Sequence, residues 1–288
     1  MGRHGAAEPR AEASPLESAR FGCSVARLTV PPGYGSLAPV REALRASDAD
    51  VVVLRYPAEN VGWFAHLLSD DGRVPLFAGS LVYWSLPAGL GRRPAPQAGL
   101  RTAALEDRET ASALVAGIFA EYGNHYAANP LFDGAAALAG YRQWAAGSAE
   151  QGRCLALWAD GACGADRAVG ATPADAAAGT AGGGRGEILG LATVADDGPR
   201  TEILLAGMVP AARGRGLYAH LLRAVEDRAL GRGAAEVVIS TQEHNTRVQR
   251  AWARYGFRPS HAVLTVHMVR SGLLSTPGRP QRPAAREG

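Results

Sequence analysis

The sequence contains no lysine, few cysteines and no long apolar run. All 30 basic residues of the 288-residue chain are arginine, and alanine and glycine abound, which reflects GC-rich coding more than function. Cys23, Cys154 and Cys163 are too few and too widely spaced for a disulfide framework or a metal site, so we expect free thiols and no metal. No apolar stretch reaches the roughly 20 residues that span a bilayer, and the polar N-terminus lacks the apolar core of a signal peptide. We therefore expect a soluble cytoplasmic protein with no membrane partner.

Charge and composition exclude a further class. The net charge of +3 is small for this length, and no basic run is interleaved with aromatic residues, so we expect no nucleic-acid partner. The hydrophobic fraction of 47% suffices for a sizeable core, and the length makes two domains the first expectation while allowing one. Composition thus predicts a globular protein and leaves its function to the motifs.

The first third of the chain alternates short apolar segments with helical patterns, which predicts a small α/β lobe over residues 15–86. The expected strands lie at residues 23–30, 49–54 and 81–86, and the expected helices at residues 39–46 and 60–69. Residues 87–99 are rich in proline and glycine, which is typical of an interdomain linker.

A second domain is expected over residues 100–270. It opens with a strand at residues 100–104 and a helix at residues 106–119. Strands at residues 154–159 and 187–194 flank an alanine-, glycine- and aspartate-rich stretch, which predicts a hairpin with an expanded loop. Three segments have biased compositions without apolar periodicity, so we expect disorder there. They are residues 1–14, 160–186 and 271–288.

The most informative segment runs from Gly207 to Tyr218 and reads Gly-Met-Val-Pro-Ala-Ala-Arg-Gly-Arg-Gly-Leu-Tyr. Its pattern predicts a strand, a glycine turn and a helix N-terminus. Gly214 and Gly216 permit positive φ and close approach to a ligand, and the first N–H groups of the helix have no intrahelical partner. An anion such as a phosphate would meet these donors and the positive end of the helix dipole. Taken alone, such a turn often does no more than join two elements.

The segments that follow make the pattern more specific. A helix ending near Arg232, a strand at residues 236–240, the loop Thr241-Gln-Glu-His-Asn245 and a second helix ending in Trp252-Ala-Arg-Tyr-Gly-Phe257 come in this order. The order resembles the GNAT superfamily of acetyl-CoA-dependent N-acetyltransferases over about half of the chain. The positions that match the motifs of the family are Arg213, Gly216, Tyr218, Asn245, Trp252, Gly256 and Phe257. Two of them depart from the family, because Tyr218 replaces a small residue and Trp252 replaces the tyrosine that often serves as general acid.

The resemblance implies a fold and a co-substrate site. The fold is an α/β (α+β) fold with a mixed, largely antiparallel sheet flanked by helices, and the co-substrate is acetyl-CoA. The CoA pyrophosphate would lie on the glycine turn, pantetheine would pair with the splayed strand near Met208, and the two arginines would add charge. Gly207 fits a bulge in that strand, although close packing would also explain it. The expected acetyl-CoA residues are Met208, Val209, Arg213, Gly214, Arg215, Gly216, Leu217, Tyr218 and Asn245.

The acceptor is an amine whose identity the resemblance constrains less. The segment from Glu121 to Asp133 and the helix after it would form one wall of the acceptor site. The expected substrate residues there are His125, Tyr126, Asn129 and Tyr141. An N-terminal lobe followed by a Tyr141-Arg-Gln-Trp144 helix is similar to the dTDP-fucosamine acetyltransferases of the family, which acetylate the 4-amino group of a nucleotide-linked deoxysugar.

Acetyl transfer needs a base, an oxyanion donor and an acid for the leaving thiolate. Glu202 is the candidate base, although it could equally be an ordinary strand carboxylate, and His125 and His244 are rivals. The backbone N–H of Met208 or Val209 would meet the oxyanion. The general acid is the role that the sequence fills least well. The indole N–H of Trp252 can donate a hydrogen bond but cannot deliver a proton at neutral pH. The candidates there are Trp252, Tyr255 and Tyr218.

Other readings stay open at this point. The fold could acetylate a free amino acid, a polyamine, an aminoglycoside or a protein N-terminus, or it could bind acyl-CoA without turnover. A homodimer is also possible. His261 and His267 lie on the expected last strand, where we expect structural roles.

Overall fold

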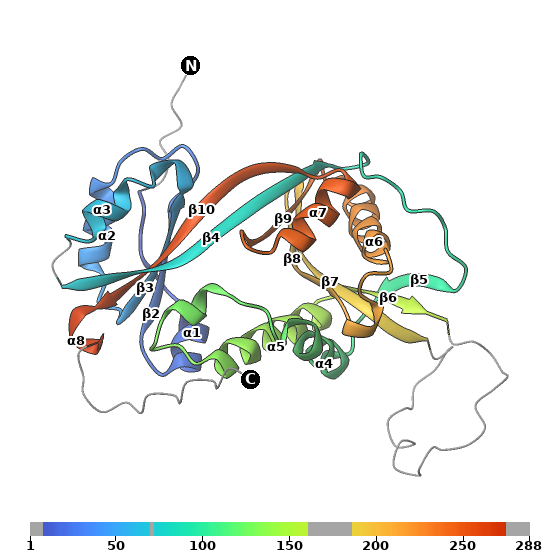
Figure 1. The fold of residues 1–288 in the computed structure, drawn as a ribbon, viewed down its shortest axis with the longest axis horizontal. Coiled ribbons are helices and arrows are strands. Elements are labelled where there is room, and N and C mark those ends of the chain that lie inside the picture. Colours follow the sequence, from blue (N-terminus) through green and yellow to red (C-terminus); the bar gives the residue numbers. More distant parts are fainter. Residues whose placement is uncertain (1–7, 70–71, 161–185, 275–288) are drawn as a thin grey trace, which may run out of the picture.

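The computed structural model describes residues 8–69, 72–160 and 186–274, and the described strands form one ten-stranded sheet (Figure 1). The strand order is β1-β2-β3-β10-β4-β9-β8-β7-β6-β5. The strands are β1 (Glu12–Ala13), β2 (Val25–Thr29), β3 (Val51–Pro57), β4 (Arg73–Pro87), β5 (Leu100–Ala104), β6 (Cys154–Ala159), β7 (Glu187–Asp197), β8 (Arg200–Met208), β9 (Glu236–Gln242) and β10 (Arg258–Arg270). Only the β2–β3 and β8–β9 pairs are parallel within this sheet of described strands, which confirms the expected mixed, largely antiparallel fold.

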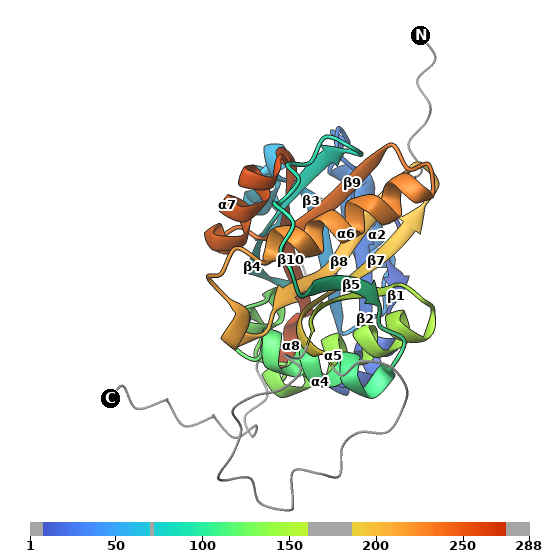
Figure 2. The same ribbon diagram turned by 90° about the vertical axis from the view of Figure 1, so that its right-hand side faces the viewer.

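Helices cover both faces of the sheet. They are α1 (Pro15–Phe21), α2 (Ala38–Ala46), η1 (Ala58–Asn60), α3 (Trp63–Leu67), α4 (Arg108–Phe119), η2 (His125–Ala128), α5 (Gly134–Glu150), η4 (Pro210–Ala212), α6 (Tyr218–Gly231), α7 (Thr246–Tyr255) and α8 (Ser271–Leu274). In the C-terminal half, α6 and α7 pack on one face and α4 and α5 on the other (Figure 2). In the N-terminal half, α2 and α3 pack on one face, and α1, η2 and the start of α5 on the other. Helix α5 therefore contacts both halves of the molecule.

The two expected lobes share this one sheet. Strand β4 pairs with β10 along nearly its whole length and with β9 from Leu81 to Pro87, so the chain of the first lobe enters the sheet of the second. Strand β10 pairs in turn with β3. The expected boundary at residue 86 thus falls at the end of a strand that lies between β9 and β10. Residues 88–99, all of them described, contain no helix or strand, whereas residue 87 of the expected linker still belongs to β4.

Most expected elements of the second half are confirmed within a few residues. The hairpin is formed by β6 and β7, and Asp133 caps α5 by accepting a hydrogen bond from the Ala136 N–H at 2.9 Å. The expected loop of the hairpin lies almost entirely outside the described residues, as does Cys163, whereas the buried Cys154 is a free thiol. The expected disorder is wrong for residues 8–14, which include β1, and for residues 271–274, which form α8.

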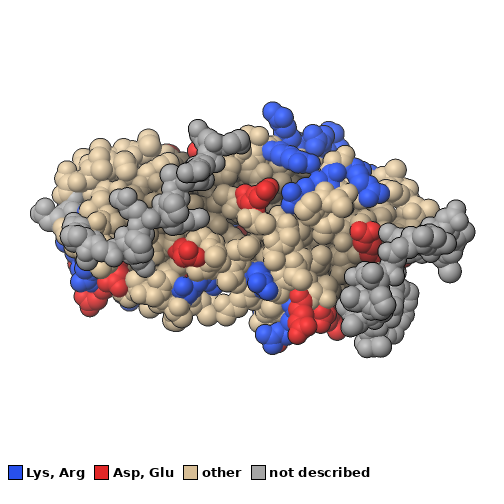
Figure 3. Space-filling view, turned by 60° about the horizontal axis from the view of Figure 1, so that its bottom comes forward, with Lys and Arg blue, Asp and Glu red and all other residues tan. Residues whose placement is uncertain are grey.

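The surface of the described residues says little about the expected absence of membrane and nucleic-acid partners. No helix in the described part of the chain is long and apolar enough to cross a bilayer. On the face drawn in Figure 3, basic side chains gather in one patch and the remaining surface carries isolated charges of both signs.

Candidate functional site

Strands β8 and β9 separate halfway along their length. Their parallel pairing joins residues 200–203 to residues 236–239, and the remainder of each strand diverges from the other. The register of β7 against β8 also shifts at Leu204, so the irregularity lies there and not at Gly207. A side chain on Gly207 would run into Ile118 of α4, so close packing explains this glycine. Past Ile203, the backbone groups of β8 that face β9 have no strand partner and can pair with an extended ligand.

The turn between β8 and α6 presents a row of free N–H groups. Gly214 and Gly216 have φ of +79° and +75°, which confirms the conformation expected of them. The N–H of Arg213 is already bonded to the Pro210 carbonyl, so the row begins one residue later than expected. The described residues provide no acceptor for the N–H groups of residues 214–218. Five free donors at the positive end of a helix favour a phosphate.

The side chain of Arg213 holds the turn in place. Its Nε donates to the Met208 carbonyl at 3.2 Å, and a terminal nitrogen donates to the Ile118 carbonyl at 2.9 Å in the last turn of α4. The guanidinium thus ties the turn to the strand and satisfies an open carbonyl at a helix C-terminus. Both acceptors are neutral carbonyls and Arg213 is exposed, so its charge remains, and its expected contribution to the anion site stays a prediction. Arg215 is exposed and has no partner in the described part of the chain, so its charge is available.

The end of β8 separates the two candidate oxyanion donors. The N–H of Val209 donates to the Leu189 carbonyl of β7 at 2.9 Å and is therefore occupied. Successive N–H groups of an extended strand point to opposite sides, so the N–H of Met208 faces the splay. Val209 is therefore corrected as an oxyanion donor, and the expected role of Met208 stays a prediction.

Glu202 has the environment of a candidate base. It lies opposite Val238 on β9, where the two strands still pair, and its half-buried carboxylate has no partner among the described residues. Burial raises its pKa, and the charge of Arg200 opposes that shift. Tyr83 on β4 is close enough to be affected by the charge of Glu202, although burial is the larger cause of its own raised pKa. A carboxylate of this kind can accept a proton near neutral pH.

Trp252 and Tyr218 form a pair between α7 and α6. The indole of Trp252 is only 2% exposed, and its Nε1 donates to the Tyr218 hydroxyl at 3.2 Å. Burial raises the pKa of Tyr218 to about 12, against the opposing effect of this hydrogen bond. The phenol missing at position 252 is therefore replaced by one beside it. Asn245 precedes α7 without capping it, because its side-chain amide donates to Thr241 Oγ1 at 3.1 Å.

Tyr255 is removed from this pair. Its hydroxyl donates to the buried carboxylate of Glu226 at 2.7 Å, and burial together with that carboxylate raises its pKa. A phenol committed to a buried carboxylate cannot serve a leaving group, so the expected catalytic role of Tyr255 is corrected to a structural one. Leu217 is likewise buried in the core, and only its backbone faces the turn.

Three of the four expected substrate residues are buried in packing. His125 Nδ1 lies 2.9 Å from His267 Nε2 of β10, and the hydroxyl of Tyr126 donates to Glu17 of α1. The side chain of Asn129 accepts from the Leu131 N–H at 3.0 Å and stabilises a turn. Their expected role in substrate contact is therefore corrected. These side chains instead fasten η2 to the N-terminal half.

Tyr141 is half-buried and packs with the rings of Phe119 and Tyr122. We name as the acceptor surface the half-buried residues Tyr83, Tyr141, Glu202, Ser240 and His261. Tyr83 stacks on His261 with ring centroids 4.5 Å apart and is hydrogen-bonded to Ser240, and the charge of Arg55 acts on both Tyr83 and Tyr141. Their positions depend on strand register across β4, β9 and β10, for which the sequence has no local signal.

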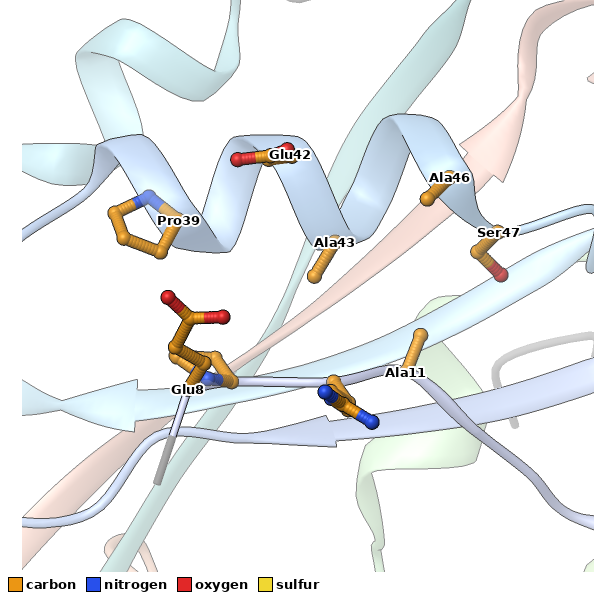
Figure 4. Close-up of a pocket in the computed structure, with 9 residues that line it drawn as sticks. Glu8, Ala11, Pro39, Glu42, Ala43, Ala46 and Ser47 are labelled. Carbon is orange, nitrogen blue, oxygen red and sulfur yellow. The ribbon is translucent and has the colours of Figure 1, made fainter. Parts of the chain in front are cut away.

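Two further features of the described residues, their possible metal ligands and a surface depression, add no candidate catalytic or binding group. No group of three or more His, Cys, Asp and Glu side chains close enough to hold a metal ion is found in the described ranges. A depression of about 440 Å³ lies between residues 8–11 and α2 (Figure 4). Its walls carry Glu8, Glu42 and several alanines, without a row of free donors. His244, the other rival base, is an exposed residue near Gly123.

Comparisons with known proteins agree with this geometry. Residues 140–257 match the Acetyltransferase (GNAT) family. A GCN5-related N-acetyltransferase from Sphaerobacter thermophilus is 15% identical with a TM-score of 0.53, covering 94% of this chain and 79% of that one. A GCN5-related N-acetyltransferase from Kribbella flavida is 17% identical with a TM-score of 0.50, covering 85% and 81%. A Drosophila protein is 14% identical with a TM-score of 0.52, covering 86% and 71%. No curated protein sequence matches the chain.

The matched range has a clear structural meaning. It begins within α5 and ends at Phe257, so it contains the splayed strands, the glycine turn and the Tyr218–Trp252 pair. The solved structures share the fold at low sequence identity and therefore support the architecture alone.

Proposed function

We propose, from the match of residues 140–257 to the GNAT acetyltransferase family, that the chain is an acetyl-CoA-dependent acyltransferase that acetylates the primary amine of a small molecule. The acceptor that we propose first is the 4-amino group of a dTDP-linked deoxysugar. The splay of β8 from β9 beside five free N–H groups is the observation that carries the proposal. An extended pantetheine chain with a diphosphate at one end matches both features.

Binding would use backbone groups for the most part. The diphosphate would accept hydrogen bonds from the N–H groups of residues 214–218, and the exposed Arg215 would add charge. Pantetheine would lie along the free edge of β8 beyond Ile203. This arrangement would bring the thioester close to the N–H of Met208.

The transfer then divides among three groups. Glu202 would take a proton from the ammonium of the acceptor, directly or through a water molecule. The amine would attack the thioester carbon, and the Met208 N–H would stabilise the oxyanion that forms. As the C–S bond breaks and the amide bond remains, the nitrogen would lose its second proton to water, and the Tyr218 hydroxyl would donate a hydrogen bond to the departing thiolate. Because a phenol with a pKa of about 12 is a weaker acid than a thiol of pKa near 8.5, this bond would stabilise the thiolate without full proton transfer.

Acetyl-CoA turnover against a panel of amines tests this proposal. Thiol release would be followed with dTDP-4-amino-6-deoxysugars, aminoglycosides, polyamines and amino acids as acceptors. Turnover restricted to the nucleotide sugars would support both the activity and the acceptor. Turnover with another amine would keep the mechanism and replace the acceptor, and tight acetyl-CoA binding without any turnover would count against the proposed acceptors altogether.

A further inference from the structure

Arg55 is a half-buried arginine of β3 that has no carboxylate partner among the described residues. One terminal nitrogen lies 3.2 Å from His125 Nε2, and its Nε is buried without a hydrogen-bond partner in the described part of the chain. Arg27, on the neighbouring strand β2, instead forms two hydrogen bonds with Glu17, at 2.7 and 2.8 Å. A cation withdrawn from water without a counter-charge is costly, so the bare guanidinium needs an explanation.

The neighbouring histidines hold Arg55 without neutralising it. A guanidinium can only donate, so His125 Nε2 must accept, and the proton of that ring must lie on Nδ1. His125 Nδ1–H then donates to His267 Nε2 at 2.9 Å, which leaves both rings neutral. Burial, with the charge of Arg55 as the second cause, keeps the pKa of His125 well below its usual value and lowers that of His267 to about 4. The pair is therefore a neutral support that fixes the position of the guanidinium.

Arg55 also lies within electrostatic reach of the acceptor surface. Its charge acts on Tyr83 and Tyr141, and Tyr83 is affected by the charge of Glu202 as well. The guanidinium and the candidate base therefore lie within electrostatic reach of one tyrosine, from opposite halves of the molecule. Thr265 pairs with Arg55 across β3 and β10, and its buried Oγ1 has no partner among the described residues. Strands β3, β10 and β4 run side by side here (Figure 1).

We propose that Arg55 binds an anionic group, a phosphate or a carboxylate, of the acceptor amine. The inference rests on the proposed acetyltransferase function and narrows its substrate class to amines that carry an acidic group some distance from the nitrogen. The planar guanidinium presents paired donors that match either anion, and the unsatisfied Nε is one of them. The Arg55 contact would fix the end of the acceptor remote from Glu202.

A binding experiment tests the anion site apart from catalysis. Inorganic pyrophosphate, and malonate in a parallel titration, are added to the full chain in saturating CoA, which occupies the glycine turn, and binding is measured by calorimetry. At least one probe should bind the native protein. Arg55→Gln keeps an N–H for His125 but removes the charge, and it should weaken that binding by about 30-fold or more. Arg55→Lys should recover part of it.

Turnover measurements use amines matched in pairs. Each pair contains an acidic member and its neutral counterpart: an amino-sugar phosphate and the amino sugar, a nucleotide-linked 4-amino sugar and its methyl glycoside, an amino acid and its amide. The acidic members of one pair should be preferred, and Arg55→Gln should abolish the preference mainly through KM. The pair of amines whose preference is lost in the variant shows whether the bound group is a phosphate or a carboxylate. Arg101→Met, on the edge strand β5 at the far end of the sheet, is the matched control and should change nothing.

The outcomes separate this inference from the proposed function. Binding of neither probe, or equal binding by the native protein and a folded Arg55→Gln or Arg55→Lys variant, would overturn the anion site even if amines are acetylated. Binding that depends on Arg55, without turnover of any amine, would keep the anion site and refute the proposed acceptors. Neutral amines acetylated as well as acidic ones would also overturn the inference.

Discussion

Glu202 combines burial, a raised pKa and the absence of a partner in the described chain, which together favour a general base. A base must be deprotonated, so native kcat/KM should fall as pH drops through the raised pKa of this carboxyl. Glu202→Gln should lower kcat/KM at neutral pH by about 10²–10⁴-fold, because the amine must then lose its proton to solvent. The loss should shrink as pH rises toward the pKa of the amine, and a pH profile of kcat/KM measures this.

The matched control is Glu187→Gln, an exposed carboxyl at the start of β7. It should leave the profile unchanged. If Glu202→Gln keeps the native profile as well, the carboxylate is an ordinary strand residue and the base must be sought elsewhere.

Tyr218 is expected to act on the leaving thiolate, because Trp252 orients its hydroxyl. Tyr218→Phe should lower kcat by about tenfold, the equivalent of one hydrogen bond of about 1.4 kcal/mol in the transition state. KM for acetyl-CoA should change little, since the backbone N–H at this position is retained. Trp252→Phe should show a smaller loss, and steady-state kinetics with one acceptor compares the two. A kcat unaffected by Tyr218→Phe would mean that the thiolate leaves unaided.

For single residues, the sequence predicted the backbone conformation better than the contacts of the side chains. The positive φ of Gly214 and Gly216 follows from local chemistry and was predicted. The roles of His125 and Tyr126 were not, because their partners come from α1, β3 and β10, which are distant in sequence. Arg55 was missed for the same reason, since an arginine within an apolar strand does not reveal what it faces.

Among the elements, α6 holds the segment between β4 and β5 through one buried carboxylate. Glu226 is fully buried and accepts from the N–H groups of Gly89 and Gly91, each at 2.8 Å, and from the Tyr255 hydroxyl. Glu226→Ala should lower the free energy of unfolding by about 3–5 kcal/mol, because it leaves buried donors unpaired and removes one of the two carboxylates that pair with Arg223. Urea unfolding measures this difference.

Asp227 provides the comparison, since it belongs to the same helix and pairs with the same arginine. Its side chain is 53% exposed, so Asp227→Ala should cost less than about 1 kcal/mol. Equal losses in the two variants would show that the segment is not held by Glu226.

Elements were predicted well where the apolar periodicity lies within the element itself. They were predicted poorly where pairing within the sheet sets the bounds and the neighbours of a strand. Strand β9 and helices α6 and α7 were predicted within a few residues. Strand β4 was predicted only from residue 81, because Pro75 and Gly79 argue against a strand, yet pairing with β10 extends it back to Arg73. Its place between β9 and β10 has no signal in the sequence at all.

For the molecule as a whole, the seam between the two halves contains several groups with shifted pKa values. Glu17 and Arg27 from the N-terminal half meet Tyr126 of η2, and His125 of η2 meets His267 of β10. Burial opposes the ionisation of Glu17, but its hydrogen bond and ion pair with Arg27 outweigh that effect and lower its pKa to about 2. The stability of the seam should therefore depend on pH.

The pKa values of His267 and Glu17 are both lowered in the folded chain, so both groups destabilise it as pH falls, each in its own pH range. Below pH 6.5 the unfolded chain protonates its histidines, whereas His267 in the folded chain resists protonation down to about pH 4. Stability should thus fall as pH drops from 6.5 to 4, by on the order of 3 kcal/mol for this residue. Glu17 stabilises fully above pH 4.5, and that contribution should be lost as pH falls toward 2.

Urea unfolding at several pH values between 4 and 7 tests the contribution of the histidine. His267→Gln keeps an acceptor for His125 but does not titrate, so it should flatten the slope of unfolding free energy against pH in this range. His244→Gln, which changes an exposed histidine, should keep the native slope. If the His267→Gln variant retains the full slope, the acid sensitivity arises outside the seam, and the seam then does not limit the stability of the shared sheet.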